Sequence, residues 1–150
     1  MGSETQEMHA NERSVDPQGL RRLLGFIAMA ILCAVSFGLV VITTTVLGVD
    51  ALRSSSTGNL DLTFSLLVIG TLSGILLASF SAWRLLAPLG SVYRRGGLSI
   101  VAGFVTVLLM LICIPVNQLF GRSGLGVLLL LFGVAAWGLS RGLRQWGVRV

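Results

Sequence analysis

Long apolar runs alternate with short polar segments along this chain. Uncharged runs cover residues 23–49, 62–83, 97–120 and 125–140. A helix needs about 20 residues to cross the roughly 30 Å hydrocarbon core of a bilayer, and every backbone polar group in lipid needs an internal partner. None of the runs alternates apolar and polar residues as a barrel strand does. The pattern predicts an all-α, polytopic integral membrane protein: a four-transmembrane-helix bundle built from two hairpins.

The polar segments predict the connections and one tail. Residues 50–61 contain a Ser/Thr/Gly cluster typical of a loop, and residues 121–124 predict a tight turn. Residues 1–19 are polar and rich in acidic side chains, which predicts a disordered cytoplasmic tail before a single domain over residues 20–150. Basic residues before an apolar run also describe a secretory signal, but 23–49 is much longer than the 7–15-residue core of such a signal. An uncleaved anchor is therefore favoured.

Composition agrees with a lipid environment. The chain has 150 residues, of which 54% are hydrophobic and 11% charged. A soluble domain needs a larger polar share to cover its surface. The net charge is +5 and every basic residue is Arg, yet the arginines flank apolar runs rather than forming a soluble basic domain. This favours contact with anionic lipid headgroups and argues against a nucleic-acid partner.

The arginines also predict an orientation, because cytoplasmic loops carry an excess of positive charge. With four crossings, only Arg53 and Arg122 lie on one side of the membrane. The other side carries Arg13, Arg21, Arg22, Arg84, Arg94, Arg95, Arg141, Arg144 and Arg149. We therefore expect a multi-pass protein of the cell's inner, cytoplasmic membrane with both termini in the cytoplasm.

Aromatic residues mark the same end. Tyr and Trp favour the headgroup level because they combine an apolar body with a polar tip. The predicted lipid-headgroup and interface residues are Arg21, Arg22, Trp83, Arg84, Tyr93, Arg94, Arg95, Arg141, Arg144 and Trp146. Residues 141–150 fit either an amphipathic helix on the inner leaflet or a continuation of the fourth span, and the sequence leaves both open.

Small residues recur at intervals of four in two of the runs. Such rows let helix backbones approach closely, which matters because lipid provides no hydrophobic drive for helix pairing. The predicted helix-packing residues are Gly70, Gly74, Ala78 and Ala82 in the second run, and Ala30, Ala34 and Gly38 in the first. Internal packing is the first interpretation, and an oligomer interface is the second.

Two further features have a structural and a functional interpretation. Pro115 removes a backbone donor and predicts a kink, so with Asn117 and Gln118 it describes either a polar pocket or an ordinary helix exit. Cys33 and Cys113 fall on different predicted helices and at different depths. A disulfide needs Cα atoms within about 7 Å, so we expect free thiols.

The sequence carries little that points to catalysis. No predicted span holds an ionisable side chain other than cysteine, and no Ser/His/Asp set, HExxH, P-loop or CxxC motif occurs. No cofactor or metal site is predicted. We expect a non-enzymatic accessory, assembly or structural subunit that forms a homo-oligomer or joins a larger membrane complex. The alternatives are a channel or carrier for a neutral solute and a holin-like protein. A lipid enzyme that holds phosphate on Arg84, Arg94 and Arg95 would also need a base, and the sequence offers none in place.

Overall fold

The structure, a computed structural model, describes residues 17–55 and 59–147, and the described chain is all-helical. It contains three long helices, α1 (Pro17–Ser54), α2 (Leu60–Leu85) and α3 (Val92–Gly147). A short 3-10 helix, η2 (Ala87–Leu89), lies in the connection between α2 and α3. Each of the three long helices is long and apolar enough to cross a membrane. The prediction of an all-helical protein of membrane type is confirmed at this level.

Local sequence signals explain where the helices begin and end. α1 begins at Pro17, whose fixed φ and missing N–H suit a first helical position. The carbonyl of Asn59 accepts bonds from the backbone N–H groups of Leu62 and Thr63, both at 3.1 Å, and so opens α2. α2 ends shortly before Pro88, which lacks the N–H group that an α-helix interior needs, and Gly90 at φ 69° turns the chain toward α3.

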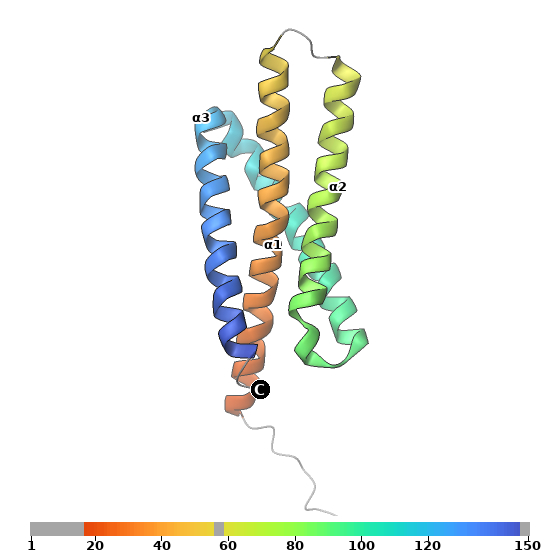
Figure 1. Cartoon of the computed structure of the whole chain (residues 1–150), viewed down its shortest axis with the longest axis vertical. Coiled ribbons are helices and arrows are strands. Elements are labelled where there is room, and N and C mark those ends of the chain that lie inside the picture. Colours follow the sequence, from red (N-terminus) through yellow and green to blue (C-terminus); the bar gives the residue numbers. More distant parts are fainter. Residues whose placement is uncertain (1–16, 56–58, 148–150) are drawn as a thin grey trace, which may run out of the picture.

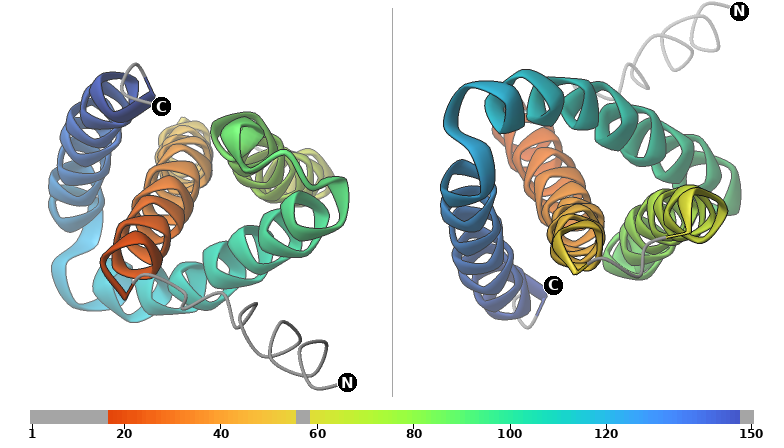
Figure 2. Two further views of the ribbon diagram at one scale, coloured as in Figure 1. Left: turned by 90° about the horizontal axis from the view of Figure 1, so that it is seen from below. Right: turned by 90° about the horizontal axis from the view of Figure 1, so that it is seen from above.

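The junction between the third and fourth apolar runs is shorter than predicted. Both runs lie within α3 (56 residues), in which two helices meet directly at a kink and no four-residue turn at 121–124 separates them. Only Gly121, at φ 60° and ψ −150°, leaves the helical conformation. This region is essentially restricted to glycine, so one residue suffices where we expected a longer turn. Figures 1 and 2 show α3 bending back at this point, and we call residues 92–120 the first arm and 122–147 the second arm.

The predicted tail and spans also shift. Residues 17–19 of the predicted tail belong to α1, which extends beyond 23–49 at both ends. Residues 1–16 of that tail, and residues 148–150 of the C-terminal segment, lie outside the described residues.

Helix α1 is the central element of the bundle. Figure 2 shows α2 and the second arm on either side of it, with the first arm crossing obliquely from one to the other. Within the most hydrophobic window of each helix, 44% of α1 is buried but only 11% of α2. The main core cluster combines Ala30, Cys33, Ala34, Val35, Leu39, Ala82, Leu86, Ala102 and Leu143.

The two ends of the bundle have different chemistry. The start of α1, the α2–α3 connection and the end of the second arm meet at one end, while the end of α1, the start of α2 and the bend of α3 lie toward the other (Figure 1). We call the first the arginine-rich end, because the segments there carry seven described arginines, Arg21, Arg22, Arg84, Arg94, Arg95, Arg141 and Arg144. Arg13 and Arg149 fall outside the described residues.

Candidate functional site

Two glycines bring the backbones of α1 and α2 into direct contact. A Cβ added at Gly38 would lie 2.7 Å from the carbonyl oxygen of Gly74 and 2.8 Å from the Cβ of Ala78. A Cβ added at Gly74 would lie 2.9 Å from the carbonyl oxygen of Gly38. Real Cβ atoms essentially never approach another atom this closely, so the two backbones touch only because both positions lack a side chain.

The other small residues of the predicted rows also face the interior. Ala30, Ala34 and Ala82 are fully buried, and Gly70 lies against the side chain of Thr45. The structure thus brings all seven small residues to contacts within the chain. These rows leave no small-residue strip of α1 or α2 free for a partner.

Hydroxyl groups inside the helices are satisfied locally. Thr43 donates to the carbonyl of Leu39 at 2.7 Å, and Thr106 donates to that of Ala102 at 2.8 Å. Thr45 bonds to the carbonyl four residues earlier in the same way. Bonds of this kind are common for hydroxyls within helices. They leave these groups directed at their own backbone, not at a shared polar cavity.

Pro115, Asn117 and Gln118 line neither of the two cavities described below. Pro115 and Gln118 are exposed and Asn117 is half-buried, all within the first arm of α3. The backbone break lies at Gly121 and not at Pro115. Neither amide side chain bonds to another described residue, and the two principal cavities are lined by other residues.

Arg95 has an internal role at the arginine-rich end. Its Nη2 donates to the carbonyl oxygen of Trp83 at 3.0 Å, and its guanidinium carbon lies 4.6 Å from the centroid of the Trp83 ring. The Nε atom is buried without a partner among the described residues. Arg95 therefore ties the first turn of α3 to the end of α2. The sequence does not distinguish Arg95 from its neighbour Arg94, which is exposed in the structure.

The remaining predicted interface residues lie on or near the surface. Arg84 stacks over Phe80 at 5.8 Å and Arg141 over Trp137 at 5.3 Å, both measured from the guanidinium carbon to the ring centroid. Tyr93 is 96% exposed. Arg21, Arg22 and Arg144 are exposed as well. Trp146 belongs to the last turn of α3, but its side chain is outside the described part of the structure.

An open groove of about 440 Å³ lies at the arginine-rich end. Three elements build it: α1, the end of α2 with its connection, and the last turns of the second arm. Its lining residues are Phe26, Phe37, Arg84, Leu85, Ala87, Pro88, Ser140, Leu143 and Arg144. The groove is thus lined by apolar residues and by two arginines contributed by different helices.

The charge around this groove is one-sided. Asp50 and Asp61 are the only carboxylic side chains among residues 17–55 and 59–147, and they lie in the last turns of α1 and the first turn of α2. Both positions are near the opposite end of the bundle (Figure 1). Arg84 and Arg144 consequently have no carboxylate partner within the described structure.

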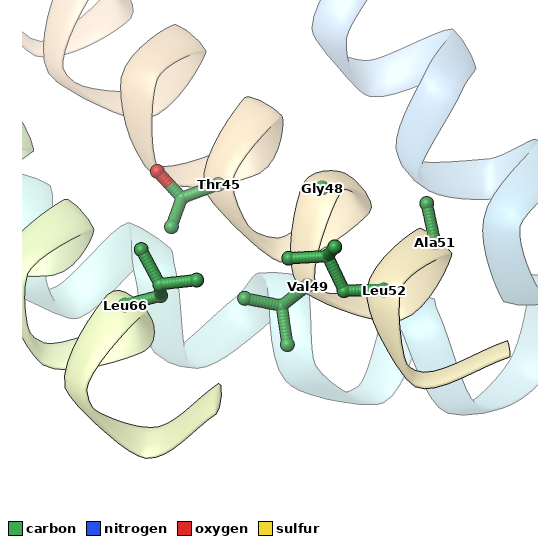
Figure 3. A pocket seen from close by; sticks show the side chains of 6 residues that line it. All are labelled: Thr45, Gly48, Val49, Ala51, Leu52 and Leu66. Atoms are coloured by element: carbon green, nitrogen blue, oxygen red, sulfur yellow. The ribbon is translucent and has the colours of Figure 1, made fainter. Parts of the chain in front are cut away.

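A second cavity, of about 560 Å³, lies between the last turns of α1 and the first turns of α2. Figure 3 shows the lining residues, which are Thr45, Gly48, Val49, Ala51, Leu52 and Leu66. The only polar side-chain atom there is the Thr45 hydroxyl, which donates to the carbonyl of Val41 at 2.8 Å. This cavity therefore offers apolar contact and no reactive group.

Cysteine chemistry does not add a site. Both cysteines are free, with Cys33 buried and Cys113 half-buried. The Cys33 Sγ donates to the carbonyl of Ala136 at 3.6 Å and so joins α1 to the second arm. Over the described residues, no group of three His, Cys, Asp or Glu side chains could hold a metal ion.

Comparison of the chain with protein-family models, curated proteins and solved structures gave no match.

Proposed function

We propose that the chain crosses the membrane four times, with both termini in the cytoplasm, and acts as a non-enzymatic accessory or assembly subunit of a membrane complex. The four crossings would be α1, α2 and the two arms of α3. A straight helix of 56 residues would be about 84 Å long, far more than a bilayer core of about 30 Å. The bend at Gly121 divides it into arms of about 40 Å each, which supports two crossings.

The distribution of charge supports the orientation. Seven described arginines belong to the segments at the arginine-rich end, against Arg53 and Arg122 toward the other end. Because cytoplasmic segments carry the excess of positive charge, the arginine-rich end would face the cytoplasm.

The observation that carries the proposed role is the exposure of α2. Its most hydrophobic window is only 11% buried, although the helix is as apolar as a membrane span. The large exposed side chains on it are Leu60, Leu62, Phe64, Leu66, Val68, Ile69, Leu72, Leu76, Leu77 and Phe80. Another protein's helix, or a second copy of the chain, can pack on this face through van der Waals contact. No specific observation favours the channel, carrier or holin-like alternatives.

Labelling with a membrane-impermeant maleimide tests the topology. Single cysteines would replace Asn59 or Tyr93 in a background with Cys33→Ala and Cys113→Ala. The proposal expects Asn59→Cys to react from outside intact cells and Tyr93→Cys to react only in inverted membrane vesicles. Reaction of both from the same side would contradict the α2 crossing. Further cysteines at Ser123 and Gln145 test the second arm in the same way, with Ser123 expected outside.

Photo-crosslinking tests the role. A benzophenone amino acid at Leu72 or Leu76 on α2 should give discrete protein adducts in native membranes. The same group at Ile100, which is similarly exposed but lies on the first arm, is the matched control. Adducts at Leu72 and Leu76 but not at Ile100 support a partner on α2, and equal adducts at all three positions would contradict a specific α2 interface. Adducts with a second copy would make the partner this chain itself. If lipid adducts alone form at Leu72 and Leu76, the proposed role is refuted.

A further inference from the structure

We propose that the groove at the arginine-rich end binds an anionic phospholipid, with the phosphate held by Arg84 and Arg144 and one acyl chain laid along α1. The inference rests on the proposed topology only in placing this end at the headgroup level. Binding in detergent depends neither on sidedness nor on a protein partner, so the two proposals fail in different experiments.

The first argument is the convergence of two charges on one groove. Arg84 comes from the last turn of α2, and Arg144 from the last turns of the second arm. Both line the same groove, although they are 60 positions apart in the numbering. A guanidinium group is always charged and its planar fork matches the oxygens of a phosphate.

The second argument is the missing counter-charge. Neither arginine has a carboxylate partner in the described structure, and both described carboxylic residues belong to segments near the other end. Arginines in the last turn of a helix also interact favourably with its dipole. That effect acts on any face of the helix, however, and does not require both side chains to line one groove. An anion bound between them would satisfy both.

The third argument is the apolar wall. Phe26 and Phe37 are eleven residues apart on α1, which places them on one face of the helix. They are separated by about 16 Å along the axis, close to the depth of one leaflet of a hydrocarbon core about 30 Å thick. Leu85 and Leu143 complete this wall from the neighbouring elements. A charged end followed by an apolar face of one leaflet's depth matches a phospholipid better than a free phosphate.

The test measures lipid retention by native mass spectrometry. The full chain in mild detergent would be titrated with phosphatidylglycerol and with phosphatidylcholine carrying the same acyl chains. We expect phosphatidylglycerol to bind at least tenfold more tightly. The double variant Arg84→Gln/Arg144→Gln should reduce this preference to within twofold of unity. Arg141→Gln removes one charge from the same helix end but lies outside the groove, so it should keep the preference within twofold of the wild type.

Three results would overturn the proposal. The first is equal binding of the two lipids by the wild type. The second is a loss in Arg141→Gln as large as in the double variant. The third concerns the melting temperature of the protein in detergent. If millimolar inorganic phosphate raises it as much as phosphatidylglycerol does, the groove binds a free anion and not a lipid.

Two further variants separate the groove from general surface charge. Ala87→Phe fills the groove without altering charge, so it should lower phosphatidylglycerol binding at least tenfold, and unchanged binding would refute a groove site. Arg84→Lys/Arg144→Lys keeps the charges and should retain part of the preference. This lysine variant replaces Arg84→Gln/Arg144→Gln in the test if that variant fails to fold. If its preference for phosphatidylglycerol equals that of the wild type, recognition by the planar guanidinium group is contradicted.

The acidic N-terminal segment is a competing occupant, and it can be tested in the full chain. Its carboxylates would be changed to amides at Glu4, Glu7, Glu12 and Asp16. We expect phosphatidylglycerol binding to stay within twofold of the wild type. A tenfold gain would identify this segment as the resident of the groove and overturn the lipid proposal.

Discussion

Substitution of Gly38 by alanine should destabilise the bundle where the backbones of α1 and α2 touch. The new methyl carbon would lie 2.7 Å from the Gly74 carbonyl oxygen, whereas ordinary contact begins at 3.4 Å. The difference between these distances means that α1 and α2 must separate by about 0.7 Å there. A gap of that size removes roughly a quarter to a half of the van der Waals attraction of each neighbouring atom pair. The obstructing atom belongs to the backbone, so no rotamer change relieves the clash. Overpacking of this kind costs about 1–3 kcal/mol.

A matched control is available on the same helix. A Cβ at Gly48 has open space within 4 Å, so Gly48→Ala should be neutral or gain up to about 1 kcal/mol from helix propensity. The free energy of unfolding would be measured in mixed micelles with increasing SDS, followed by fluorescence of the chain's three tryptophans. Both variants gain the same helix propensity, so we expect them to differ by the overpacking cost of about 1–3 kcal/mol.

The double variant sharpens this test. Gly38 and Gly74 face each other across one contact, so Gly38→Ala and Gly74→Ala should together cost less than the sum of the single effects. If Gly38→Ala is as stable as Gly48→Ala, the close approach of α1 and α2 does not hold the bundle together. Strict additivity of the two single changes would contradict their shared contact.

Three other predictions follow from single positions. Gly121→Ala should lower the free energy of unfolding by about 1–3 kcal/mol because φ 60° with ψ −150° excludes a side chain. Gly126→Ala, where a Cβ would enter open space, should not lower it. Equal effects of the two substitutions would contradict the requirement for glycine at the bend. Arg95→Gln should cost about 1–3 kcal/mol through the lost hydrogen bond and ring contact and should speed proteolysis of the α2–α3 connection, whereas exposed Arg94→Gln should change the free energy by less than about 0.5 kcal/mol. Cys33, which is fully buried, should resist maleimide in mild detergent and react only after SDS unfolding, and rapid labelling in the folded protein would contradict its burial.

The helical class and the small-residue positions could be anticipated from sequence because each depends on local patterning. Gly38 in α1, and Gly74 and Ala78 in α2, each belong to a row of small residues at intervals of four. Such an interval places a row on one face of its helix, whatever that helix packs against. The kink at Pro115 stays a prediction, and the residue of α3 that leaves the helical conformation is Gly121. A proline kinks a helix that can otherwise continue, whereas a positive φ at glycine can redirect the whole chain.

The arginines illustrate the other limit. Arg84, Arg94 and Arg95 were equivalent candidates for headgroup contact in the sequence. In the structure Arg95 is held by Trp83, Arg84 lines the groove, and Arg94 is exposed. Composition reports that positive charge gathers in a segment, but the partner of each side chain depends on residues from other helices.

The sequence by itself determined that this chain forms long apolar helices and that its arginines gather in a few segments, because hydropathy and helical spacing act over neighbouring residues. Only the tertiary structure decided which faces meet: that α1 is central, that one glycine bends α3, and that Arg84 and Arg144 share a groove. Those outcomes depend on close approach between residues distant in the chain, and no local pattern encodes the distance between two helices.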